Sequence, residues 1–271
     1  MTSQPLKLGG VPEHFNLPWH LAMASEECAD LNLTWEDQPG GTGQMLAKLD
    51  SCELDLVSIL TEGMFSAIDK GAPVTVLQVY VASPLQWGAF VPAASRFESL
   101  DELADARIAI SRFNSGSHLM AFVTGEAQGW TLTDDQFVVV GGIDGAVESF
   151  AGAHSDLFLW ERHMTQPLVD AGKFRRVGVL ETPWPSFVIA VRTEVLAART
   201  TEVGRVVDAV IAQAQGLHSN PKAAELIEKR YGLEPETVQS WLASTEFAER
   251  SSLDPSIQRK VLDTLSNAGF S

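Results

Sequence analysis

The sequence predicts an α/β fold built from parallel βαβ units, and three observations support this. Short apolar runs alternate with helix-like segments through the first 82 residues, as in parallel sheets whose strands are joined by helices. Turns rich in Gly, Pro and polar residues follow the apolar runs at 12–18, 39–43 and 61–63. With 271 residues, 45% of them hydrophobic, the chain can bury a large core as one domain or two lobes.

The expected elements of the N-terminal region alternate simply. Apolar or alternating runs predict strands, and apolar residues at helical spacing predict helices. The expected strands are 6–11, 31–36, 54–60 (a buried parallel strand) and 74–82. The expected helices are 19–30, 44–51 and a short one that ends at Ile68. Ser83-Pro84-Leu85 then breaks the pattern.

The pattern restarts after Pro84 and ends in a helical region. Further strands are expected at 87–92, 107–110, 137–141, 155–160, 174–180 and 187–191. Helices are expected at 99–103, 119–128 and 146–151. Thr182-Pro183-Trp184-Pro185 is interpreted as a stiff turn. From Thr193 the chain is predicted to be helical, with three shorter helices centred near Leu226, Trp241 and Val261.

Charge and composition exclude several classes of protein. The chain has 35 acidic and 19 basic residues, a formal net charge of -16, and no cluster of Lys and Arg. Binding to nucleic acid or to an anionic membrane surface is therefore not expected, because both need clustered cations. No apolar stretch reaches the roughly 20 residues of a membrane span, so no membrane insertion is expected.

The N-terminus and the cysteines bear on cellular location. The first residues lack the basic and apolar regions of an export signal, which predicts a cytoplasmic protein as the sequence stands. If an export signal was trimmed, the protein would be periplasmic or lipid-anchored. Cys28 and Cys52 match neither a zinc-ligand spacing nor a CxxC pair, and two buried thiols are expected rather than a disulfide.

The segment from Ile108 to Met120 carries the clearest functional signal. An apolar run ends at Ile110, a small polar turn follows, and a helix is expected behind it. Its Ser and Gly residues lie where the first amides of a helix need capping, and such amides can also hold an anionic or polar ligand. An ordinary capped turn and half of a ligand site both fit this pattern.

Five motifs together resemble one known family. They are Gly10-Val11-Pro12-Glu13-His14-Phe15, Pro39-Gly40-Gly41-Thr42-Gly43, Leu60-Thr61-Glu62-Gly63, Ile110-Ser111-Arg112-Phe113-Asn114-Ser115-Gly116-Ser117-His118 and Pro183-Trp184-Pro185-Ser186-Phe187. With the order of elements, they are similar to the type II periplasmic-binding-protein fold. The likeness is to the branch of the sulfonate- and taurine-binding and thiamine-pyrimidine synthase-like proteins, and within it to a subgroup of bacteria and fungi that lacks export signals.

The resemblance implies a two-lobed architecture. Each lobe would be a mostly parallel sheet flanked by helices, with a ligand cleft between the lobes. Residues 1–87 and 186–271 would form lobe 1, in which C-terminal helices complete the N-terminal βαβ units, and residues 88–185 would form the inserted lobe 2. The crossovers between the lobes would be 82–89 and 184–190.

The resemblance also implies a ligand site with contributions from both lobes. The candidates are Pro12, Glu13, His14, Phe15, Thr42, Gly43, Thr61, Glu62, Ser111, Arg112, Asn114, Ser115, Gly116, Ser117, His118, Asp144, Trp160, Glu161 and Trp184. Because the glutamates would repel a simple sulfonate, a small polar or anionic ligand that also carries an amine or ring nitrogen fits better.

Several of these residues allow two interpretations. His14 can contact a ligand, act as an acid or base, or pair with Glu13. Asp144 can be a helix cap or a ligand contact. Arg112 can face the ligand or brace a carboxylate such as Glu161. The aromatic candidates Phe15, Trp160 and Trp184 can sandwich a planar ligand or pack in the core.

The expected function is that of a solute-binding protein similar to those of ABC transporters. Its partners would be a small molecule and an ABC permease or another protein. No cofactor, metal or catalytic residue is expected, since Glu161 and His163 lack a third metal ligand.

One alternative is a cytosolic enzyme related to the menaquinone pathway or to thiamine-pyrimidine synthesis, although the cysteine-rich iron-binding run of the latter is missing. His14, Glu62 and Glu161 would then be the acid/base candidates. A ligand sensor is the other alternative.

Overall fold

A computed structural model of the chain describes residues 4–249 and 254–267. The chain divides into two compact units. Unit 1 takes Met1–Ser83 and Trp184–Val261, and unit 2 takes Pro84–Pro183 together with the chain from Leu262 on. Two long strands, β4 (Val74–Pro92) and β8 (Phe174–Arg192), run from one unit into the other.

The sheet of unit 1 is built around β1 (Leu6–Gly10). Strand β1 pairs in parallel with β2 (Leu33–Asp37) and with β3 (Leu56–Leu60). Strand β3 pairs antiparallel with β8, so the order in this unit is β2-β1-β3-β8-β4. Because β1, β2 and β3 are parallel, the loops that follow them gather at one edge of the sheet.

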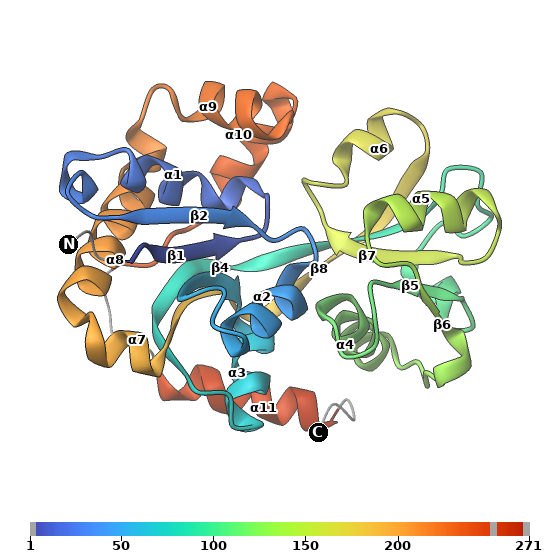
Figure 1. Cartoon of the computed structure of the whole chain (residues 1–271). Helices are drawn as coiled ribbons and strands as arrows, with labels where there is room; N and C mark the ends of the chain where they lie inside the picture. Colours follow the sequence, from blue (N-terminus) through green and yellow to red (C-terminus); the bar gives the residue numbers. More distant parts are fainter. Residues whose placement is uncertain (1–3, 250–253, 268–271) are drawn as a thin grey trace. The chain divides into compact units, whose positions relative to one another are not determined.

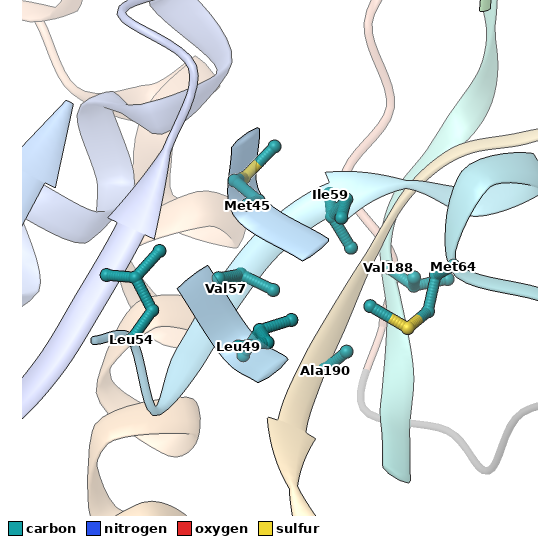
Figure 2. Close-up of a cluster of buried hydrophobic side chains, with 8 residues drawn as sticks. All are labelled: Met45, Leu49, Leu54, Val57, Ile59, Met64, Val188 and Ala190. Atoms are coloured by element: carbon teal, nitrogen blue, oxygen red, sulfur yellow. The ribbon is translucent and has the colours of Figure 1, made fainter. Parts of the chain in front are cut away.

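One face of this sheet is covered by α2 (Gly41–Asp50) and α3 (Thr61–Asp69). Figure 2 shows the apolar cluster beneath them, to which the two helices contribute Met45, Leu49 and Met64. Strands β3 and β8 contribute alternate residues, as expected for strands with one face against helices. They are Val57 and Ile59 of β3 and Val188 and Ala190 of β8. This core fixes the starts of α2 and α3 relative to the strand ends.

Helices from both ends of the chain cover the opposite face of unit 1. Helix α1 (Leu17–Met23) packs against α8 (Thr200–Gly216), which carries the predicted apolar stripe on its buried side. In Figure 1 these segments, blue and orange, lie side by side. The remaining C-terminal helices are α7 (Thr193–Ala198), α9 (Ala223–Tyr231), α10 (Pro235–Ser244) and α11 (Pro255–Asn267). The predicted helical C-terminal region is confirmed.

Unit 2 repeats the βαβ pattern on a smaller scale. Strand β5 (Ile108–Ile110) pairs in parallel with β6 (Phe137–Val139) and β7 (Leu157–Glu161), and β7 pairs antiparallel with β4. The helices are α4 (Gly116–Gln128), α5 (Ile143–Ala151) and α6 (Gln166–Asp170). A cluster of buried Phe and Ala side chains, joined by half-buried Val and Leu residues, packs α5 and α6 onto β4, β7 and β8. Short 3-10 helices occupy 14–16, 26–28, 100–103, 134–136 and 217–219.

The breaks predicted at Ser83-Pro84-Leu85 and at 182–185 are wrong, because β4 and β8 continue through them. Proline cannot donate to a strand ladder, but nearby hydroxyl groups make bonds that the main chain lacks. The Leu85 amide donates to Thr182 Oγ1 at 3.1 Å, and Ser186 Oγ donates to the Ser83 carbonyl. Thr61 Oγ1 donates to the Pro185 carbonyl at 2.6 Å. The proline-rich segments therefore stay extended.

Other differences from the sequence predictions are smaller. The helix predicted at 19–30 is split into α1 and a 3-10 turn, and α2 begins at Gly41 rather than at Gln44. Cys28 is buried as expected, but Cys52 is exposed, and both are free thiols. Among the described residues, no helix is both long and apolar enough to cross a membrane.

Candidate functional site

The starts of α2 and α3 meet at the edge where the parallel strands of unit 1 end. A Cβ atom added to Gly63 would lie 2.3 Å from Cγ2 of Thr42. The absence of a side chain at Gly63 therefore permits the close approach of the two helix starts. Neither helix has a side-chain cap, since the N-cap residues are Gly40 and Leu60. First-turn amides of a helix have no intrahelical acceptor. Thr42, Gly43 and Thr61, all predicted site residues, belong to these two first turns.

Glu62 is the most unusual group at this edge. Its side chain is 3% exposed, and the indole Nε1 of Trp184 donates to Oε2 at 2.9 Å. The other oxygen, Oε1, is buried and has no hydrogen-bond partner among the described residues. Burial raises the pKa of this carboxyl to about 7, although its own backbone amide and Trp184 oppose the shift by hydrogen bonding. Glu62 thus keeps one acceptor position open.

Trp184 orients this carboxylate. Its ring is 3% exposed, and unit 1 contains both Trp184 and Glu62 although they are far apart in sequence. A charge-assisted hydrogen bond from an indole fixes one oxygen and leaves the other to face a different donor. The predicted role of Trp184 as a wall for a planar ligand stays a prediction, whereas its bond to Glu62 is a structural fact.

The segment after β1 divides between core and surface. Pro12 is exposed, and Glu13 is half-buried, with desolvation raising the pKa of its carboxyl to about 7. His14 is fully buried, stacked on Phe15 at 4.7 Å and edge-on to Trp241 at 4.5 Å. The Phe15 carbonyl accepts a 2.7 Å hydrogen bond from the Tyr80 hydroxyl. His14 and Phe15 therefore help to form an aromatic core that holds Glu13 at the edge.

In unit 2, the turn between β5 and α4 is fixed by its own side chains. Ser115 is the N-cap of α4, and its hydroxyl accepts from the His118 amide at 3.3 Å. His118 Nδ1 in turn accepts from the Asn114 amide at 3.1 Å, which holds Asn114 at a φ of 61°. Ser117 Oγ accepts from the Ser111 amide at 2.9 Å. The predicted cap of this helix is confirmed, and the helix begins at Gly116 rather than at Leu119.

The side chains around this turn differ in exposure. His118 is buried edge-on against Phe137 at 4.4 Å, and burial lowers its pKa. Arg112 is half-buried, and desolvation lowers the pKa of its guanidinium. Arg112 forms no ion pair with a described carboxylate, so the suggested bracing of Glu161 is not observed. The turn thus combines fixed hydroxyl groups with a cation that lacks a counter-charge.

The remaining predicted residues of unit 2 follow β6 and β7. Asp144 is exposed in the first turn of α5, and the N-cap of that helix is Gly142, so Asp144 is not its cap. Trp160 is half-buried and stacks on Phe158 at 5.1 Å. Glu161 is buried, and its Oε2 accepts from the Met164 amide at 2.6 Å, which closes the turn before α6.

Comparison with known proteins identifies the family. Residues 89–180 match the Ca3427-like periplasmic binding protein (PBP) family. The solved CA3427 gene product of Candida albicans, which has the generic periplasmic-binding-protein fold, is 30% identical with a TM-score of 0.92. The similarity covers 99% of this chain and 91% of that one. The chain belongs to the Ca3427-like family. Both the resemblance and the fold class expected from the sequence are confirmed.

More distant structures share the fold of this Ca3427-like protein. The alkanesulfonate-binding protein SsuA of Xanthomonas axonopodis pv. citri, bound to MOPS, is 16% identical with a TM-score of 0.82, over 100% of this chain and 95% of its own. A zinc-bound ligand-binding component of an ABC-type import system from Staphylococcus aureus is 12% identical with a TM-score of 0.79, over 99% and 93%. These likenesses establish the fold alone. A comparison with curated proteins gave no match.

Two residues near the predicted ligand contacts of this Ca3427-like protein were not predicted from the sequence. Asn16 is 1% exposed, and its Nδ2 donates to the Val11 carbonyl at 2.7 Å, next to Gly10, which has no room for a Cβ atom. The glycine at the end of β1 was the available signal. Phe113 is 47% exposed although it lies inside a recognised motif. In the part of the chain that the structure describes, no three His, Cys, Asp or Glu side chains are grouped to hold a metal ion.

Proposed function

We propose that this Ca3427-like protein binds a small polar or anionic metabolite that donates a hydrogen bond to Glu62, as the binding component of an ABC-type import system. The observation that carries the proposal is the buried Glu62 carboxylate, with one oxygen held by Trp184 and the other without a partner. A buried carboxylate oxygen in this state favours a ligand with an N–H or ammonium donor, because that donor compensates for lost hydration.

The charge at the start of α3 supports a donor rather than a simple anion in unit 1. A helix N-terminus ordinarily favours an anion, but the carboxylate of Glu62 already occupies the first turn of α3. Glu13, in the segment that follows β1, adds a second carboxyl at the same edge of the sheet. A ligand with an amine or ring N–H therefore complements unit 1 better than a bare sulfonate does.

The β5–α4 turn of unit 2 by itself suits an anionic or polar group. Its hydroxyl groups are held in place by short-range hydrogen bonds, and Arg112 offers a guanidinium without a paired carboxylate. The alkanesulfonate-binding and import-system proteins that share the fold support a role in solute capture, with a permease as partner.

The test is a thermal-shift screen of pooled amine-bearing carboxylates, sulfonates and heterocycles, followed by calorimetry on each hit. Glu62→Gln should weaken a hit by about 10- to 100-fold, the usual worth of a charge-assisted hydrogen bond. Glu236→Gln, which changes an exposed first-turn glutamate of α10, should leave the affinity unchanged. Unchanged affinity of the Glu62→Gln variant would refute the assignment.

A further inference from the structure

Arg162 and Arg176 are two of the five arginines of unit 2 that no predicted ligand contact uses. Arg162 follows β7, and Arg176 lies on β8. Both are half-buried, and neither forms an ion pair with a described carboxylate, although the chain has 35 acidic residues. Arg107 and Arg175 of the same unit are paired with Asp156 and Glu98. Half-burial without a direct ion pair is costly for a guanidinium, and Asp170 acts on Arg176 only at a distance, so these two positions need an explanation.

Each of the two guanidinium groups is held by a glutamine in the same way. Arg162 Nη1 donates to Gln86 Oε1 at 2.8 Å, and Gln86 Nε2 donates to Glu181 at 3.2 Å. Arg176 Nη1 donates to Gln166 Oε1 at 2.7 Å, and Gln166 Nε2 donates to Asp170 at 2.7 Å. The carboxylates thus bind the amide ends of the glutamines. This arrangement orients the arginines while leaving their charge without a contacting anion.

The two arginines lie close to the same turn of the chain. Gln166, which holds Arg176, begins α6 one turn after Arg162. The backbone N–H of Gln166 donates to the His163 carbonyl at 3.2 Å. His163 is buried, and its burial, followed by the charges of Arg162 and Arg176, lowers its pKa to about 4. His163 is therefore neutral at pH 7, and the two guanidinium groups supply the positive charge. Their planar forks match the oxygens of carboxylate, sulfonate or phosphate groups.

We propose that Arg162 and Arg176 form an oxyanion-binding site in unit 2, oriented by Gln86 and Gln166. Each arginine uses one N–H on its glutamine, and a guanidinium has five such donors, so several remain for an anion with three or four oxygens. A tetrahedral oxyanion is the expected class of ligand group, whether it arrives as a free ion or as part of a larger molecule. The proposal rests on residues of unit 2 alone and does not depend on the role proposed for Glu62.

The test uses the full chain with inorganic sulfate as the probe, by calorimetry at constant ionic strength in chloride. Wild type should show saturable binding of one sulfate per chain, and phosphate should compete. Arg162→Gln and Arg176→Gln should each weaken binding by about tenfold or more. Arg175→Gln removes the same charge from a paired neighbour of Arg176 and should have no effect. Arg112→Gln, which removes the guanidinium of the β5–α4 turn, should also leave sulfate binding intact, and this separates the site from the anion contact of the proposed function.

A further variant guards against loss of folding in the arginine substitutions. Gln166→Glu places a carboxylate against Arg176 and should abolish sulfate binding by neutralising it, while circular dichroism shows a folded chain. Sulfate binding that survives in this variant and in both Arg→Gln variants would overturn the site, as would equal loss in Arg175→Gln. A wild type that binds no sulfate would overturn it directly.

Discussion

At the scale of single residues, Glu62 combines burial with incomplete hydrogen bonding. Its folded-state pKa of about 7 lies above the ordinary value of 4.5. Between these two pH values the unfolded chain releases the proton while the folded chain keeps it, so stability falls as pH rises through this window. Below pH 4.5 both states are protonated and the penalty is absent. Above pH 7 the penalty is complete and amounts to at most about 3 kcal/mol.

Glu62→Gln should therefore stabilise the protein at pH 8 by about 1–3 kcal/mol and change little at pH 4.5. Glutamine can accept the Trp184 bond and never ionises. The measurement is urea unfolding of wild type and variant across this pH range. Glu236→Gln is the control and should show no pH-dependent difference. A stabilisation of equal size at both pH values would mean that ionisation of Glu62 is not its cause.

His14 shows why the residue scale limits prediction from sequence. Its position after a strand predicted a place at the ligand-binding edge, and its neighbour Glu13 does lie there, half-buried. The ring of His14 instead packs against Trp241, which belongs to α10 at the far end of the chain. No residue near His14 in the sequence indicates its contact with Trp241. Ser115 could be predicted as a cap because capping depends only on its immediate neighbours.

At the scale of elements, the contact between α2 and α3 depends on Gly63. Gly63→Ala would place its methyl group 2.3 Å from Cγ2 of Thr42, so the two helix starts should be forced apart. The expected destabilisation is about 1–3 kcal/mol, the usual cost of overpacking. Thr42→Ser removes only Cγ2, and the remaining Thr42 atoms lie at 3.5 Å or beyond, so the double variant should recover most of the lost stability.

Chemical denaturation of the four chains measures this coupling as a double-mutant cycle. Thr42→Ser alone serves as the control and should cost well under the Gly63→Ala penalty. If both variants destabilise the chain and the effects simply add, then the methyl contact is not the reason for glycine at this position.

The strands β4 and β8 mark the limit of prediction at this scale. The apolar runs on both sides of each proline-rich segment predict strands, whereas the prolines themselves predict breaks that the structure does not have. The continuity depends on hydroxyl groups of Thr61, Thr182 and Ser186 that hydrogen-bond to the main chain. Such bonds join segments far apart in sequence, whereas the rule that proline ends strands is local.

At the scale of the whole molecule, the alternation of strands and helices was enough to predict the fold class. Parallel βαβ units have a short-range signature, because each strand and helix is encoded by its own period of apolar residues. The pairing of β3 with β8 is not encoded in this way, since these strands are joined through the whole of unit 2. The family resemblance supplied that long-range order.

The net charge of -16 gives a final prediction for the whole molecule. Like charges on a compact chain repel one another more than on an unfolded chain, and salt screens this repulsion. Raising NaCl from about 10 to about 150 mM shortens the Debye length from roughly 30 to 8 Å. At pH 7.5 the melting temperature should rise by roughly 2–4 °C, equivalent to about 1 kcal/mol. At pH 5, near the isoelectric point of 4.7, the net charge is small and the rise should disappear. Chloride is used because sulfate would also occupy the oxyanion site. An equal rise at pH 5 would show that salt acts through something other than net charge, since self-repulsion is the one contribution that vanishes there.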